Sequence, residues 1–183
     1  IMVPLMLVIA GLQKVSVKLW TAILIATIGL YFLLDPTGSG VNLGDIFTFG
    51  CAISFAIHII LQDRYVKKEI NVTRFFLVQV AAVTVFSFLC SFIFDTQSPT
   101  WSPELINALL MTGIVATTIA ILIMVWAQQI LNPSQTALIF SLEPVFAALF
   151  SWILINEKLG IISGFGGLLV VLAVIWSESS DKN

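Results

Sequence analysis

The sequence predicts an all-α membrane protein built as a polytopic bundle of helices. Hydrophobic residues make up 59% of the 183 residues and charged residues only 10%, whereas a soluble globular chain carries about 25% charged residues. The apolar residues are gathered in segments long enough to cross a bilayer, which requires about 20 residues of helix. The composition therefore excludes a soluble domain. A net charge of −2 also argues against nucleic acid as a partner.

Hydropathy defines one partial span and six complete spans. The opening apolar stretch, from Ile1 to about Leu12, is too short to cross about 30 Å of hydrocarbon at about 1.5 Å per residue. We therefore expect the chain to begin inside a helix. The complete spans are predicted at Leu19–Leu34, Ile46–Gln62, Arg74–Phe94, Leu105–Gln129, Ser134–Ile155 and Leu159–Trp176.

Local signals mark the ends of several spans. The run Asp35-Pro-Thr-Gly-Ser-Gly40 is a cluster of turn-forming residues. Ser102-Pro103-Glu104 supplies a helix cap, a proline suited to the first turn and a favourable negative charge. Asn132-Pro133 starts the following span in the same way.

The distribution of basic residues predicts the orientation. Lys158 is the only basic residue on one side of the predicted membrane. The other side carries the remaining seven, which are Lys14, Lys18, Arg64, Lys67, Lys68, Arg74 and Lys182. Because loops rich in Lys and Arg stay in the cytoplasm, we expect a cytoplasmic C-terminus in a multi-pass protein of the cell (inner) membrane.

A weak internal repeat accompanies this topology. Shifting the chain by 144 residues places Gln13-Lys14 over Glu157-Lys158 and Leu19–Leu34 over the last helix. The match rests on the pattern of apolar and small residues. Since the charge distribution puts the two loops on opposite sides, the pattern favours an inverted-topology repeat, a common design of secondary transporters.

Glu143 is the first candidate site residue. It lies near the middle of the apolar run 136–155, where a charge costs about 2.5 kcal/mol or more to insert. The adjacent Pro144 removes one backbone donor and loosens the helix. We interpret Glu143 as the floor of a transport cavity, where it binds a cationic substrate group or carries a coupling proton. The alternative is a structural carboxyl group bonded to serines and to opened backbone.

Further candidates for substrate binding or coupling lie on other spans. Gly50, Ser54, His58 and Gln62 recur every four residues and give one helix a polar face. Because an imidazole can gain or lose a proton near neutral pH, His58 is a candidate for proton coupling or substrate orientation, with an interhelical hydrogen bond as the alternative. Gln79 and Trp126 complete the set. Trp126 is equally suited to the aromatic belt at the membrane interface.

Small residues spaced by four predict helix packing. The patterns are Gly160-xxx-Gly164, Ser163-xxx-Gly167 and Ala22-xxx-Ala26, which allow close approach of helices or of protomers and make a homodimer a candidate assembly. The expected partners are therefore the lipid bilayer, a small-molecule substrate and a second copy of the chain. Cys51 and Cys90 lie in apolar segments, and we expect no cofactor, no metal site and no enzymatic activity.

The sequence also resembles a known family. The stretch Gly113–Ser177 is similar to the second half of EamA-type transporters of the drug/metabolite transporter (DMT) superfamily, with an N-terminal truncation, and Gly44-Asp45 resembles the start of that family's second repeat. Asn156 stands where the family usually has glycine. The matching elements are Trp126-Ala127, Asn132-Pro133-Ser134, Ala137, Glu143-Pro144-Val145-Phe146-Ala147-Ala148, Asn156-Glu157-Lys158-Leu159, Gly164 and Gly167.

The resemblance implies a DMT-type fold of ten helices in two inverted five-helix repeats. Residues 1–34 would be the end of the first repeat (helices four and five, incomplete), residues 44–177 the second repeat (helices six to ten) and residues 178–183 a polar cytoplasmic tail. The implied function is secondary transport, as an exporter or exchanger, of small organic metabolites such as amino acids or drug-like amines by alternating access.

Other functions remain open from the sequence. A seven-helix receptor-like protein fits the number of segments, although the first span is short. A membrane-embedded enzyme would need convergent ligands or a nucleophile with its base, which a single histidine and scattered carboxylates do not supply. An inactive fragment of a transporter is the third alternative, because half of the cavity wall would be absent from these residues.

Overall fold

The structure, a computed structural model, describes residues 2–34, 42–68, 71–94 and 99–179. Every regular element in these ranges is a helix, and six stretches are long and apolar enough to cross a membrane. These are Val17–Leu34, Leu43–Val66, Val72–Phe94, Pro103–Ala127, Pro133–Ile155 and Ile161–Glu178. The prediction of an all-α polytopic membrane protein is confirmed. Asp35 and residues 180–183 of the predicted tail, with Lys182, lie outside the described residues.

The chain divides into two compact units. The first comprises Ile1–Leu61 and Leu131–Asn183, and the second comprises Gln62–Ile130. Helix α3 (Leu43–Val66) contributes to both, because the division falls between Leu61 and Gln62. The first unit also contains α1 (Met2–Ile9), α2 (Val17–Leu34), α7 (Pro133–Phe140), α8 (Glu143–Ile155) and α9 (Ile161–Glu178).

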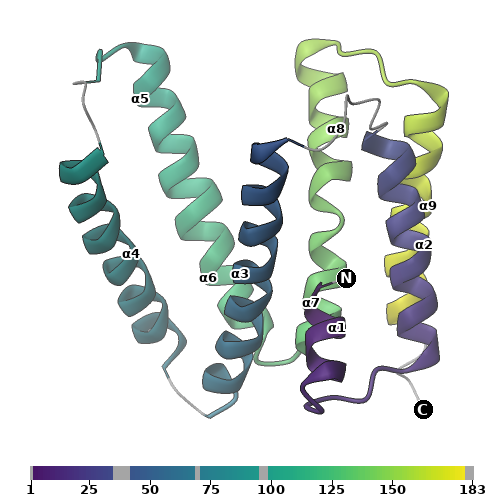
Figure 1. Cartoon of the computed structure of the whole chain (residues 1–183). Coiled ribbons are helices and arrows are strands. Elements are labelled where there is room, and N and C mark those ends of the chain that lie inside the picture. The colour runs from purple at the N-terminus through teal and green to yellow at the C-terminus, as the bar shows by residue number, and fades with distance from the viewer. Residues whose placement is uncertain (1, 35–41, 69–70, 95–98, 180–183) are drawn as a thin grey trace. The chain divides into compact units, whose positions relative to one another are not determined.

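Helices α2 and α9 form the most extensively packed pair of the first unit and lie side by side (Figure 1). They run antiparallel. Near the start of α2, the Nζ atom of Lys18 donates a hydrogen bond of 3.0 Å to the carbonyl oxygen of Ser177, near the end of α9. Towards the other end of the pair, Gly29 of α2 meets Gly166 of α9. The negative C-terminal end of the α9 dipole also stabilises the positive charge of Lys18.

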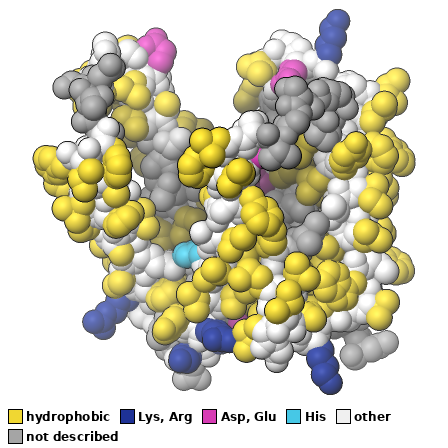
Figure 2. All heavy atoms as spheres, in the orientation of Figure 1, with side chains coloured by type: hydrophobic (Ala, Val, Ile, Leu, Met, Phe, Trp, Pro, Cys, Tyr) yellow, Lys and Arg dark blue, Asp and Glu magenta, His cyan; other side chains and the backbone are white. Residues whose placement is uncertain are grey.

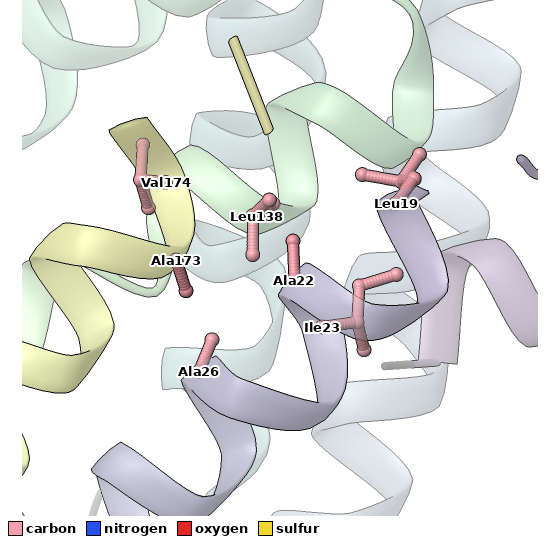
Figure 3. Packing of buried hydrophobic residues seen from close by; sticks show 7 residues of the cluster. All are labelled: Leu19, Ala22, Ile23, Ala26, Leu138, Ala173 and Val174. Atoms are coloured by element: carbon pink, nitrogen blue, oxygen red, sulfur yellow. The ribbon is translucent and has the colours of Figure 1, made fainter. Parts of the chain in front are cut away.

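The core of the first unit lies where α2, α7 and α9 meet (Figure 3). Four residues come from α2, one from α7 and two from α9. They are Leu19, Ala22, Ile23, Ala26, Leu138, Ala173 and Val174, all less than 9% exposed. The alanines let the backbones approach closely. In lipid the hydrophobic effect does not drive helices together, so van der Waals packing of this kind holds them in contact.

The second unit is built from the end of α3, from α4 (Val72–Phe94) and from one continuous rod (Figure 1). The rod consists of α5 (Pro103–Leu110), the π-helix η1 (Met111–Ile119) and α6 (Ala120–Ala127). In η1, the hydroxyls of Thr117 and Thr118 each donate a 2.8 Å hydrogen bond to the carbonyl five residues earlier. Hydropathy correctly predicted the span but not this π-helix, because apolar content does not distinguish bonding to the fourth from bonding to the fifth preceding carbonyl.

Hydrophobic side chains cover much of the visible surface of the helices, while charged side chains gather towards helix ends (Figure 2). In α4, Phe76 is the only buried residue among those described. Surfaces of this kind are stable in hydrocarbon and unstable in water. The exposed apolar faces and the six long helices together support a multi-pass membrane protein.

Candidate functional site

Helix α7, which leads to Glu143, begins at a well-capped end. The side chain of Asn132 accepts a 2.9 Å hydrogen bond from the backbone N–H of Gln135, and the Gln135 side chain accepts one of 3.2 Å from the Asn132 N–H. This reciprocal capping box, with Pro133 in the first turn, fixes where α7 starts. The predicted start of this span at Asn132-Pro133 is thereby observed.

A break between α7 and α8 sets the position of Glu143. The N–H groups of Ser141 and Leu142 donate to the carbonyls of Leu138 and Ile139, three residues earlier, at 3.0 Å each. The tighter turn follows from Pro144, which has no N–H for the preceding turn and crowds its carbonyls. Helix α8 then restarts at Glu143. The interruption agrees with the expected loosening beside the carboxylate.

The Glu143 side chain is exposed and occupies the first turn of α8. Within the described residues its carboxylate has no hydrogen bond or ion pair. It stands ten residues after Pro133 and twelve before Ile155, near the middle of the span Pro133–Ile155. The N-terminus of α8 favours a negative charge there, but helix polarity alone does not replace the lost hydration of a carboxylate.

The span that carries Glu143 also contains Thr136, Ala147 and Ser151. Thr136 is buried and its hydroxyl donates to the carbonyl of Asn132 at 3.1 Å. The hydroxyl of Ser151 donates to the carboxylate of Glu157 in the loop after α8. Ala147 lines a groove of about 430 Å³ that also includes Pro144 and Ser151. Ala147 and Ser151 therefore line a groove, and the Ser151 hydroxyl is bonded to Glu157 in the loop.

On α3, the predicted polar stripe changes from exposed to half-buried. Ser54 is exposed, and its hydroxyl donates to the carbonyl of Gly50 at 3.0 Å. His58 is half-buried and stacks against Phe55 with ring centroids 6.1 Å apart. Phe55 in turn packs edge-on against Phe140, the last residue of α7, at 5.8 Å. The histidine thus sits beside the aromatic contact between α3 and α7.

The second unit contains a chain of three glutamine amides. The Nε2 atom of Gln79 on α4 donates to Oε1 of Gln62 on α3 at 3.0 Å. Nε2 of Gln62 donates to Oε1 of Gln128, just after α6, at 2.5 Å. Gln62 and Gln128 are 2% and 0% exposed. This cluster joins three helices through groups that are expensive to leave unpaired in a membrane protein.

Two predicted candidates belong to this second unit. Gln79 is a member of the amide chain, and its Oε1 atom is buried with no hydrogen-bond partner among the described residues. Trp126 on α6 is 59% exposed and stays outside the cluster. The sequence analysis placed Gln62 on a polar helix face and did not single out Gln128. It missed their pairing, because no local pattern relates residues 66 positions apart.

The closest helix approach among the described residues joins two glycines that the sequence analysis did not single out. Gly160 and Gly164 are exposed, and a Cβ added at Gly164 would meet nothing within 4 Å. Gly167 is buried in ordinary contact with Leu33 and Val145, and Ala22 and Ala26 lie in the core. The tightest approach joins Gly29 and Gly166, where a Cβ on either residue would collide with backbone of the other helix.

The described residues offer no evident metal centre. Among them, no group of three or more His, Cys, Asp or Glu is arranged to hold an ion. Cys51 and Cys90 are free thiols. Of the predicted candidates, the carboxylate of Glu143 and the half-buried His58 belong to the first unit, and the Gln79 amide belongs to the second.

Comparisons with known proteins place these features in a family. Residues 42–178 match the model of the EamA-like transporter family. An uncharacterized transporter of Archaeoglobus fulgidus is 35% identical over 155 residues, covering 85% of this chain and 49% of the relative. The WAT1-related protein At3g30340 of Arabidopsis thaliana is 25% identical, covering 72% of this chain and 40% of the relative. The uncharacterized transporter YoaV of Bacillus subtilis is 20% identical, covering 88% and 57% respectively.

The chain spans about half the length of the curated relatives it matches. No solved structure matches it significantly. The family model covers α3 to α9, including the break at Glu143 and the amide chain of the second unit. This match favours a membrane transporter over the seven-helix receptor-like alternative. The chain belongs to the EamA-like transporter family.

Proposed function

We propose that the full-length protein is a secondary transporter that moves small organic metabolites, such as amino acids or drug-like amines, by alternating access. It acts as an exporter or exchanger. Family membership supports transport in general. The observation that carries the finer proposal is Glu143, an exposed carboxylate at a helix break near the middle of a membrane span.

The chemistry of that position selects a cationic ligand. A carboxylate at mid-span costs about 2.5 kcal/mol or more to insert, and this cost falls when a positive group or a proton neutralises it. An ammonium group of an amino acid or amine would form an ion pair with Glu143. A proton would instead make it a neutral acid. The first role is substrate binding, and the second is energy coupling.

The proposal also covers four further residues, the second repeat, the orientation and a homodimer. His58, Ser54, Gln79 and Trp126 are secondary candidates for substrate contacts or coupling. Residues 44–177 would form the second repeat and residues 178–183 a cytoplasmic tail, with the protein in the cell (inner) membrane. The excess of basic residues on one side supports this orientation. A homodimer through the exposed small residues of α9 is part of the same proposal.

The test uses the full-length protein in proteoliposomes with a panel of radiolabelled amino acids and amines. Glu143→Gln is the test variant, and Glu104→Gln, in the first turn of α5 at a span end, is the matched control. We expect Glu143→Gln to reduce transport to the level of empty vesicles while insertion and melting temperature are unchanged. The control should transport normally.

Two readouts separate the roles of Glu143. Loss of both proton-driven uptake and substrate counterflow would indicate substrate binding, while loss of uptake with intact counterflow would indicate proton coupling. Normal transport by Glu143→Gln would refute a transport role for this residue. A wild-type protein that moves no member of the panel would refute the proposed substrate class.

A further inference from the structure

A cavity lined by hydroxyl groups lies within the first unit, between α1, α2 and α7. Its volume is about 300 Å³, near the lower end of the range of about 300–1,000 Å³ for small-molecule sites. Met2, Ile23 and Leu30 contribute apolar wall. The hydroxyl groups that line it belong to Thr27, Ser134 and Ser141.

Ser134 is the unusual member of this lining. Its relative exposure is 0%, and its Oγ atom is buried with no hydrogen-bond partner among the described residues. Nearly all buried polar atoms in native structures have a partner, so an isolated one calls for a ligand or water. The second residue of α7 therefore presents an unused donor and acceptor at the cavity wall.

The other two hydroxyls define what the cavity recognises. Thr27 donates to the carbonyl of Ile23 at 2.7 Å, and Ser141 donates to the carbonyl of Leu138 at 2.5 Å. Each has used its proton in its own helix and retains only acceptor capacity. Ser134 thus has the one uncommitted donor among the three hydroxyls. None of the described residues that line the cavity has a charged side chain, so these residues would not compensate a charged ligand group for its lost hydration.

We propose that this cavity binds a small uncharged molecule with a compact apolar body and one hydroxyl group, such as a monocyclic phenol. The ligand hydroxyl would exchange hydrogen bonds with Ser134, and its ring would contact the apolar wall. The volume suits a single ring better than a drug-sized molecule. The proposal does not rest on transport or on Glu143, which does not line the cavity.

The experiment maps and measures binding in the full-length protein in lipid nanodiscs. A diazirine-bearing phenol is photolysed with the protein, and mass spectrometry identifies the labelled peptides. Unlabelled p-cresol and its hydroxyl-free counterpart toluene then compete with the labelling. We expect label on peptides of α1, α2 and α7, and stronger competition by p-cresol than by toluene.

Variants at Ser134 and Ala137, with one control, distinguish the hydrogen bond from the cavity volume. Ser134→Ala should weaken competition by p-cresol about three- to tenfold, the range for one lost hydrogen bond, and leave toluene unchanged. Ala137→Phe, with Ala137→Leu as the milder version, should fill the cavity and prevent specific labelling. Thr48→Val, which removes an exposed hydroxyl bonded within its own helix, is the matched control and should change nothing.

Several results would overturn the proposal. Equal competition by p-cresol and toluene in the wild type would show that no hydroxyl is recognised. Labelling spread evenly over exposed apolar residues would indicate lipid partitioning, and specific labelling insensitive to Ala137→Leu in a folded protein would place the ligand elsewhere. Absence of competition by either molecule would mean that water or lipid occupies the cavity.

Discussion

The contact between Gly29 and Gly166 gives the sharpest prediction for stability. A Cβ at Gly166 would lie 2.5 Å from the carbonyl oxygen of Gly29 and 2.9 Å from the carbonyl carbon of Phe32. Both are backbone atoms, so no side chain can rotate away. Gly166→Ala therefore requires α2 and α9 to separate.

The size of the effect follows from that geometry. Ordinary contacts of a Cβ begin at 3.4 Å, so the two backbones must move apart by about 1 Å at this point. A gap of about 0.5–1 Å forfeits a quarter to a half of each dispersion contact across it. The pair is the most extensively packed of the described helices, and overpacking of this kind costs about 1–3 kcal/mol. The corresponding fall in melting temperature is about 3–10 °C.

The assay is thermal unfolding of the detergent-solubilised full-length protein, followed by tryptophan fluorescence. In the monomeric fraction of the protein, Gly164→Ala is the matched control on the same helix, since a Cβ there meets nothing within 4 Å. Alanine is also the better helix former, by about 0.5–1 kcal/mol, so the control should melt at or slightly above the wild-type temperature. Equal melting of Gly166→Ala and wild type would refute the close approach of α2 and α9.

Two further predictions concern the amide chain and the topology. Gln62→Leu removes the acceptor of Gln79 and the donor to Gln128, so it should destabilise the protein by about 1–2 kcal/mol. Gln129→Leu, at the exposed position next to Gln128, should have little effect. Equal melting temperatures of the two variants would contradict a structural role for the amide chain. Cysteines introduced singly at Lys14 and Lys158, which precede the antiparallel helices α2 and α9, should react with an impermeant maleimide from opposite sides of the membrane. Labelling of both from one side would exclude the antiparallel pair in the bilayer.

The positions of the helices were predictable, and their contacts were not. Hydropathy placed all six spans because apolar length is a local property, and Pro144 indicated the break at Ser141–Leu142 for the same reason. The amide chain depends on which helices are neighbours, so Gln62 alone gave no signal of its partners. The four-residue spacing of Gly160 and Gly164 suggested a packing face, but the closest approach of two described helices is at Gly29 and Gly166.

The packing of α2 against α9 gives a physical explanation for the weak repeat at an offset of 144 residues. Under this shift, Gly29 corresponds to Ala173 and Gly166 corresponds to Ala22. A two-fold axis relating the copies would therefore convert the Gly29–Gly166 contact into one between Ala173 and Ala22, and both alanines lie in one buried cluster (Figure 3). Ala26 corresponds to Val170, and these residues, 3% and 0% exposed, would lie at the axis. What recurs at Gly29, Gly166, Ala22 and Ala173 is a small residue. Since glycine and alanine both allow close packing, an inverted repeat can keep this contact while losing residue identity.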